Sequence, residues 1–329
     1  MRWGADIGSG ARRLLLKASV VGACLALTGT IAGTARAEDL KVVATIKPIH
    51  ALVAGVMTGV GTPELLVAGA ASPHTFALKP SGARALHAAA VVFRVSPAVE
   101  PFTVKIAASL PATVRVSTLA DAPGVQHLAM RHGATFHDHS HGGEDHPADG
   151  AMDGHVWLDP QNAKAMVAEI ARVLSEAAPD AAATFAANAQ RLRAEIDALD
   201  AEIDAALNPV RDKPYVVFHD AYQYFDHRYR LSPVGALTIA PDVQPGAKRI
   251  SEIRAEIAKV GAVCVFAEPQ FPAKVMRAVT DGTEARFGTL DPEGALVEPG
   301  AAAYGTLMRN LAESLRGCLA PQPASSAAN

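Results

Sequence analysis

Residues 191–200 read RLRAEIDALD and form the centre of a long amphipathic pattern. Apolar residues recur there every three or four positions with charged residues between them, which predicts a helix. We expect this helix to begin after Pro179, with Asp180 as its cap, and to end near Leu207. At the usual rise of 1.5 Å per residue it would be about 40 Å long, roughly the length of a domain. The pattern therefore predicts one rigid connector between two parts of the chain.

Predicted strands and helices alternate on both sides of this connector. Before it, strand-like runs and helical spacings occur at 41–46, 49–59, 64–67, 81–89, 90–95 and 113–116. After it, they occur at 215–218, 233–237, 251–259, 263–266, 285–290 and 302–318. A further helical pattern follows Pro160, and we expect Ser81 to cap the helix at 81–89. Such alternation indicates parallel α/β layers, so the sequence predicts an α/β protein with two similar lobes.

These patterns divide the chain into consecutive regions. We expect an N-terminal α/β lobe at 38–178, a linking helix at 179–207 and a C-terminal α/β lobe at 208–329. Within the first lobe, residues from about 127 to 153 are rich in Gly, His and Asp and show no periodicity. That composition predicts a flexible loop.

Residues 1–37 have the pattern of a secretory signal peptide. A basic start precedes an apolar run from 18 to about 33, and Ala35-Arg36-Ala37 is a small-x-small cleavage site. The apolar run is shorter than the roughly 20 residues that a membrane span needs. We therefore expect cleavage after Ala37 and a location outside the cytoplasm, with lipid attachment at Cys24 as the alternative.

The charge and the cysteines of the remaining chain fit an exported protein. Loss of residues 1–37 removes five basic side chains and one acid, which moves the formal charge from −3 to −7. An acidic protein is a poor candidate for binding nucleic acid and suits cationic cargo. Cys264 and Cys318 remain, and in an oxidising compartment they predict a disulfide between a core strand and the last helix. Two buried free thiols are the alternative.

Three histidines lie where predicted elements begin or end. His74 follows one predicted strand, His155 precedes a helix and His219 ends another strand. Ligands of open α/β sheets bind beyond the carboxyl ends of the strands. A single histidine at such a place is more often structural. Three of them supply most of a tetrahedral Zn²⁺ shell, so together they predict a zinc site.

Two carboxylates follow later predicted strands. Asp291 is our candidate for a fourth metal ligand, although a water molecule could take that position and Asp-Pro also favours a turn. Glu268 is expected either to orient a ligating histidine from outside the metal shell or to form a hydrogen bond between the lobes.

A second group of histidines lies in the predicted loop, interleaved with acids and glycines. The residues are His132, His137, His139, His141 and His146. This composition is typical of a weak auxiliary metal binder that collects Zn²⁺ near the predicted zinc site or senses its excess. A solvated acidic loop without a specific role is the alternative.

Four segments of the chain resemble a known family. In order they read ASPHTFALKPSGARAL, HVWLDPQNA, VVFHDAYQYF and VFAEPQF. They resemble the zinc-type members of the cluster A-I solute-binding proteins, the ZnuA-type periplasmic receptors of bacterial zinc ABC importers. The resemblance runs from about Lys41 to Cys318. It implies two Rossmann-like (βα)4 lobes joined by one long rigid helix, with the metal in the cleft between them.

The resemblance also implies particular residue roles. His74, His155 and His219 match the family's metal ligands, and Cys264 and Cys318 match its disulfide. Manganese-type relatives carry a carboxylate at the third ligand, so a third histidine favours Zn²⁺ as the transported ion. Some zinc-type members have a Glu directly before the first ligand, where this chain has Pro73, which leaves Asp291 or water for the fourth position.

The function implied is that of a high-affinity Zn²⁺ receptor and not of an enzyme. It would be a monomer that delivers zinc to a membrane permease. A manganese or nickel receptor or a surface adhesin on the same fold are the alternatives. A zinc hydrolase is disfavoured because the chain has no HExxH motif and no nucleophile elbow.

Overall fold

The computed structural model describes residues 40–131, 135–136, 151–238, 245–272 and 274–321. They belong to one compact unit, Ala35–Asn329. The predicted signal peptide, with Cys24, lies outside the described residues, and so do the five histidines between 132 and 146. Within the part of the chain that the structure describes, none of the helices combines the length and the hydropathy that a bilayer crossing requires.

The first sheet has four parallel strands in the order β2-β1-β3-β4. Its strands are β1 (Val42–Ala44), β2 (Glu64–Leu65), β3 (Val91–Arg94) and β4 (Arg115–Thr118). The helices that follow its strands are α1 (Lys47–Val56), α2 (Pro80–Ala88) and α3 (Phe102–Ala107). Every residue of β1 is buried, as expected of a strand covered on both faces.

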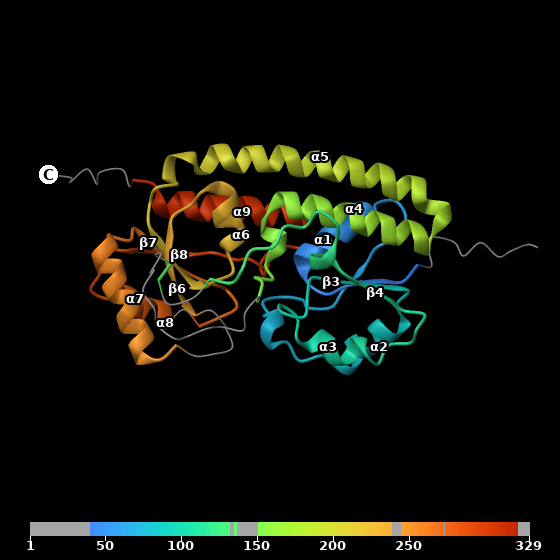
Figure 1. The fold of residues 1–329 in the computed structure, drawn as a ribbon, viewed down its shortest axis with the longest axis horizontal. Helices are drawn as coiled ribbons and strands as arrows, with labels where there is room; N and C mark the ends of the chain where they lie inside the picture. Colours follow the sequence, from blue (N-terminus) through green and yellow to red (C-terminus); the bar gives the residue numbers. More distant parts are fainter. Residues whose placement is uncertain (1–39, 132–134, 137–150, 239–244, 273, 322–329) are drawn as a thin grey trace, which may run out of the picture. The chain divides into compact units, whose positions relative to one another are not determined.

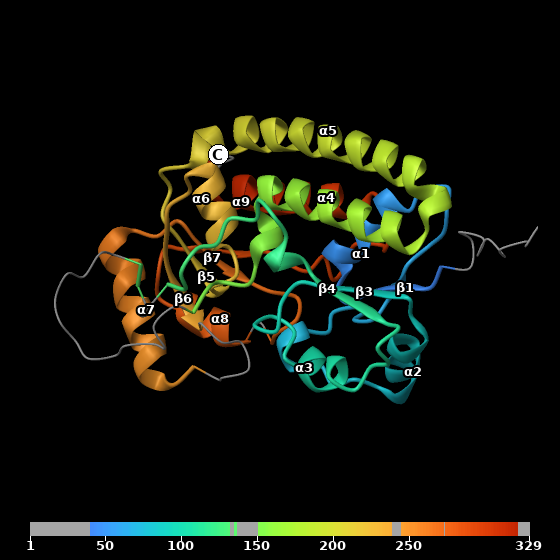
Figure 2. The same cartoon turned by 45° about the vertical axis from the view of Figure 1, so that its right-hand side comes forward.

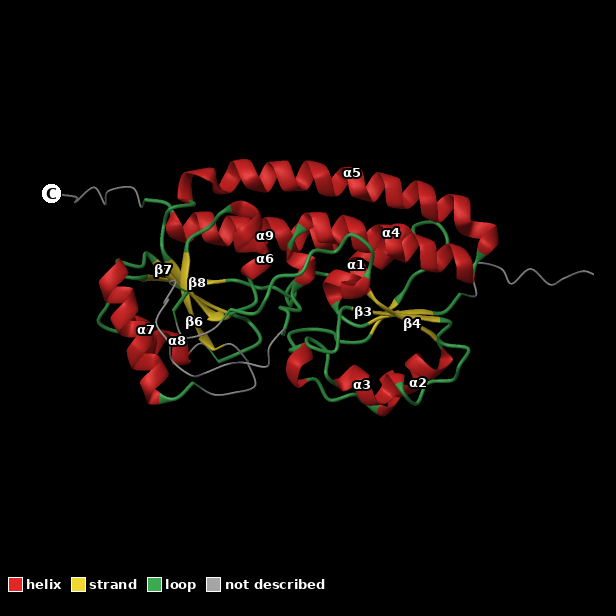
Figure 3. Ribbon diagram, viewed as in Figure 1, coloured by secondary structure: helices red, strands yellow, loops and turns green. Residues whose placement is uncertain are grey.

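The second sheet repeats this topology, with parallel strands in the order β6-β5-β7-β8. Its strands are β5 (Tyr215–His219), β6 (Pro233–Thr238), β7 (Cys264–Ala267) and β8 (Arg286–Thr289). Its helices are α6 (Gln223–Tyr229), α7 (Ala247–Val260) and α8 (Lys274–Thr280). Figure 3 shows the two sheets in yellow, each with helices beside it. The predicted α/β class is confirmed.

Three long helices form a layer that extends over both sheets (Figures 1 and 2). They are α4 (Pro160–Ala177), α5 (Ala182–Leu207) and α9 (Ala303–Leu319). The apolar stripe of α5, which includes Leu192, Ile196 and Leu199, is buried as its periodicity predicts. Helix α9 contacts both α5 and α1, so among the described residues the last helix packs against the first. One apolar core therefore joins residues of both sheets.

The local signals at several element ends were interpreted wrongly from the sequence. Helix α2 begins at Pro80, which suits a first helical position, so Lys79 and not Ser81 precedes it. A short 3-10 helix at Pro179–Ala181 contains Asp180, and no side chain caps α5. The fourth strand lies at Arg115–Thr118, two residues later than predicted, since Val114 closes a turn. Helices α3, α6 and α8 were not predicted.

A disulfide joins Cys264, the first residue of β7, to Cys318 in the last turn of α9. The Cα atoms of the two cysteines are 6.2 Å apart. The predicted link between the last helix and a core strand is confirmed, and the alternative of two free thiols is wrong.

Candidate metal centre

Three histidines, each at or near the end of a different secondary-structure element, lie close together. His74 lies in the short 3-10 helix Pro73–Thr75, His155 directly precedes the 3-10 helix Val156–Leu158, and His219 is the last residue of β5. One nitrogen of each ring lies within 4.8 Å of the others. The Nε2 atoms of His74 and His155 are 3.2 Å apart. Among the described residues, no other group of histidines, cysteines and acids could hold a metal ion in this way.

The surroundings keep His74 uncharged. Burial, reinforced by His155 and His219, lowers the pKa of His74 to about 2. His155 and His219 are almost fully buried, with 5% and 3% of their surface exposed. A neutral imidazole offers a lone pair to a metal ion, whereas a protonated one does not.

Asp153 orients His155 within the group. Its Oδ1 atom lies 2.7 Å from Nδ1 of His155 and also accepts the backbone N–H of His155 at 2.9 Å. We infer that Nδ1 carries the proton, which leaves Nε2 of His155 free to bind a metal. Asp153 was not predicted from the sequence, although an acid two residues before a candidate ligand was a usable signal.

Glu268 lies beside His219. Its Oε1 atom is 3.8 Å from Nδ1 of His219, too far for a direct hydrogen bond, and accepts the hydroxyl of Tyr222 at 3.1 Å. Glu268 is 4% exposed, so it places a buried acid next to this histidine.

Asp291 is not brought into the histidine group. Its Oδ1 atom accepts the side-chain amide of Gln270 at 2.9 Å and the backbone N–H of Glu293 at 3.2 Å. The carboxylate is thus engaged by Gln270 and Glu293, and the group of facing ligand atoms comprises the three histidines.

The three histidines open onto a cavity of about 210 Å³. Its other walls include Met130, Arg131, Met152, Asp153 and Gln223. A water molecule needs on the order of 10–15 Å³ of such space, so the cavity has room for one beside the imidazole nitrogens. The arrangement can therefore hold an ion with three nitrogen ligands and a fourth ligand from the cavity side.

Comparisons with known proteins found a matching family, similar sequences and solved structures of similar fold. The family described as "Zinc-uptake complex component A periplasmic" matches residues 42–318. The chain is 43% identical over 319 residues to the high-affinity zinc uptake system protein ZnuA of Brucella abortus (strain 2308), covering 89% of this chain and 96% of that protein. It is 40% identical over 324 residues to the same-named protein of Paracoccus denitrificans (strain Pd 1222), with the same coverage. A solved structure described as "Crystal structure of ZnuA" has a similar fold, with a TM-score of 0.72 and 22% identity over 85% of this chain and 99% of that chain.

Proposed function

The chain belongs to the ZnuA family of periplasmic zinc-uptake components, and we propose that it binds zinc through His74, His155 and His219. It is the Zn²⁺ receptor of an ABC importer, whose membrane permease is its partner. We propose further that the receptor is monomeric and has no catalytic activity, and that residues 1–37 are a signal peptide cleaved after Ala37.

The observation that carries the ligand assignment is the convergence of three imidazole nitrogens within 4.8 Å. Imidazole suits Zn²⁺, whereas Mn²⁺ prefers carboxylate and carbonyl oxygens. For the fourth position we propose a water molecule from the cavity, with Asp291 as the alternative. Asp291 would have to exchange its hydrogen bond with Gln270 for the metal. Glu268 would offset the positive charge beside His219 when zinc is bound.

We propose that the chain is organised as two lobes, 38–178 and 208–329, with the linking helix at 179–207 between them. The strands support this division, since all of β1–β4 precede the linking helix and all of β5–β8 follow it. His74 and His155 would then come from the first lobe and His219 from the second, which places the metal between them.

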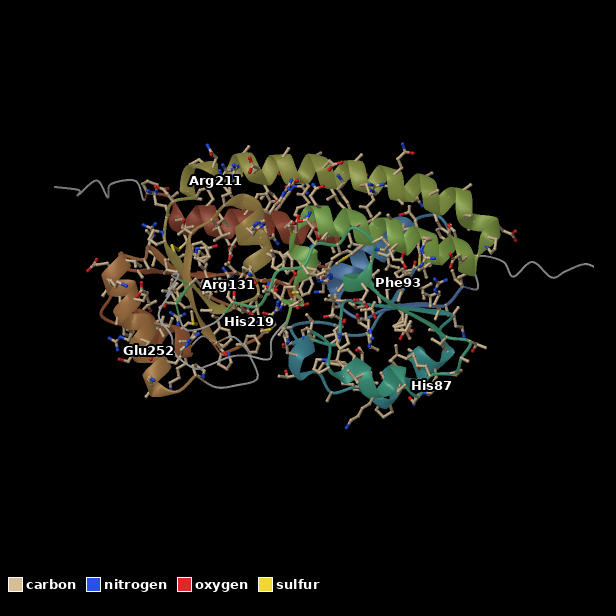
Figure 4. The ribbon with its side chains drawn as sticks, in the orientation of Figure 1. His87, Phe93, Arg131, Arg211, His219 and Glu252 are labelled. Atoms are coloured by element: carbon tan, nitrogen blue, oxygen red, sulfur yellow. A yellow bond between two sulfur atoms is a disulfide. The ribbon has the colours of Figure 1, made fainter. Side chains whose placement is uncertain are left out.

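Substitution of each ligand tests the assignment. Titration of the wild type with Zn²⁺ against competing chelators should give one tight site, and His74→Ala, His155→Ala and His219→Ala should each lose it. His87→Ala is the matched control, because His87 is exposed on α2 and lies far from His219 in Figure 4. Tight binding that survived in all three ligand variants would disprove the assignment.

The five histidines between 132 and 146 are proposed as an auxiliary zinc collector or sensor. Deletion of residues 132–149 should leave the tight site intact and remove additional weak equivalents of zinc. The same titration measures both, and a tight site lost with the deletion would contradict a merely auxiliary role.

A further inference from the structure

The two chain segments that flank the histidine-rich stretch lie side by side. Residues 128–131 and 151–153, which we call the loop base, run antiparallel with an isolated bridge between Ala129 and Met152. The N–H of Met130 donates to the carbonyl of Ala151 at 3.1 Å, and the N–H of Asp153 donates to the carbonyl of Leu128 at 2.9 Å. The loop base therefore has a defined backbone geometry and forms one wall of the metal cavity.

Arg131 ties the loop base to the strand end that carries His219. Its Nε donates to both carboxylate oxygens of Asp220, at 3.0 and 3.1 Å, and its Nη2 donates to Oδ2 of Asp226 at 3.0 Å. The guanidinium also lies over the ring of Phe136, 4.0 Å from its centre. Asp220 directly follows His219 and both acids are buried, so this ion pair fixes the backbone beside the third histidine. Arg131 and His219, both labelled in Figure 4, line the same cavity.

Tyr224 ties the same loop base to α6. Its hydroxyl accepts the N–H of Leu128 and donates to the carbonyl of Asp153, both at 2.9 Å. The neighbouring Gln223 donates its side-chain amide to the carbonyl of Ala129 at 3.0 Å. One buried hydroxyl thus bridges both segments of the loop base, including the residue whose carboxylate orients His155.

We propose that Arg131 and Tyr224 are positioning residues that hold the backbone of His155 and that of His219 in register for zinc. The inference rests on the proposed zinc site. Asp153 orients the imidazole of His155, Tyr224 fixes Asp153, and Arg131 fixes Asp220 next to His219. The contacts cross between the parts of the chain before and after α5, which is where the two histidines have to meet.

The placement of charge supports a role beyond packing. A buried ion pair gives little net stability, because removal of the charges from water offsets most of their attraction. Its directed hydrogen bonds do fix geometry, since the planar guanidinium engages two carboxylates in a set orientation. The pair lies at the metal cavity, where fixed geometry determines how long a metal ion stays bound.

Conservative variants test the proposal in zinc-loaded protein. Tyr224→Phe and Arg131→Gln should each weaken zinc binding about 10- to 100-fold, mainly through faster release, while the stoichiometry stays at one. Arg131→Lys should fall between these variants and the wild type, because it keeps the charge but not the fork. Zinc release into excess chelator gives the rates. The visible absorption spectrum of Co²⁺ in the same site should change in the variants, since it reports ligand geometry.

Arg309→Gln is the matched control. Arg309 pairs with Glu202 between α9 and α5, but both side chains are about half exposed and neither lines the cavity. This variant should release zinc at the wild-type rate.

A purely structural role predicts a different result. If Tyr224→Phe and Arg131→Gln lowered thermal stability but kept the wild-type release rate and Co²⁺ spectrum, the proposal would be overturned. Tyr224→Phe decides the matter if Arg131→Gln does not fold. Absence of a tight zinc site in the wild type would instead refute the proposed function, so the two failures are distinguishable.

Discussion

At the residue scale, metal-site chemistry depends on which groups can lose their proton. The folded protein lowers the pKa of His74 to about 2 through burial and two neighbouring imidazoles, whereas the group ordinarily titrates near 6.5. Below pH 6.5, His74 therefore binds a proton in the unfolded chain but not in the folded, metal-free protein. The free energy of unfolding should fall as the pH falls below 6.5, by up to about 1.4 kcal/mol per pH unit from this group.

His74→Gln tests this linkage, because glutamine does not titrate. Between pH 6.5 and 5 the metal-free variant should lose about 1–2 kcal/mol less stability than the wild type. Urea unfolding at several pH values measures the difference. A wild-type slope in His74→Gln would contradict the lowered pKa of His74.

Prediction from sequence succeeded at residues whose place follows from topology. The convergence of His74, His155 and His219 could be predicted because each lies at the end of a predicted element, where α/β proteins bind ligands. The position of Arg131 beside the histidines could not be predicted, because its partner Asp220 lies 89 residues later and no local sequence pattern indicates the ion pair. Asp291 was chosen by the same strand-end reasoning, but the choice of hydrogen-bond partner depends on where Gln270 lies in space.

At the scale of the elements, the length of a helix decided whether it could be predicted from the sequence. Helices α4, α5 and α9 are long enough to show several turns of an amphipathic period, and the predicted ends of α5 and α9 lie within a few residues of those observed. Helices α3, α6 and α8 have six or seven residues, fewer than two full turns, so no period emerges. The predicted caps of α2 and α5 were wrong because a proline at or just before each helix start shifted that start by one or two positions.

We expect the buried apolar stripe of α5 to provide most of the stability that this helix contributes to the fold. Ile196 is 2% exposed, and Ile196→Ala should lower the free energy of unfolding by about 2–5 kcal/mol through the cavity it leaves. Glu195→Ala changes the neighbouring position, whose side chain is 55% exposed, and should cost less than about 1 kcal/mol. Urea unfolding compares the two. Equal effects would show that the stripe does not determine how the helix packs.

At the scale of the whole molecule, the disulfide and the metal centre lie at opposite ends of the second sheet's strands. Cys264 is the first residue of β7, and Glu268 directly follows the last residue of that strand. The disulfide closes a separation of 54 residues, so replacement of both cysteines by serine should lower the free energy of unfolding by about 4 kcal/mol in the chain-entropy account.

Zinc affinity should stay at the wild-type value in this cysteine-free variant, because the bridge does not touch the metal site. Urea unfolding and chelator competition on the same protein give both values. A large loss of affinity would show that the position of α9 controls the metal centre.

The packing of α9 against α1 has a consequence for how the receptor is made. Synthesis and passage across a membrane both proceed from the N-terminus, so α1 emerges long before its partner. The part of the chain that contains α1 must wait with part of its core uncovered until α9, which ends at Leu319, has arrived. Chains truncated shortly before α9 should therefore be substrates for periplasmic proteases and chaperones over their entire length, rather than half-folded receptors.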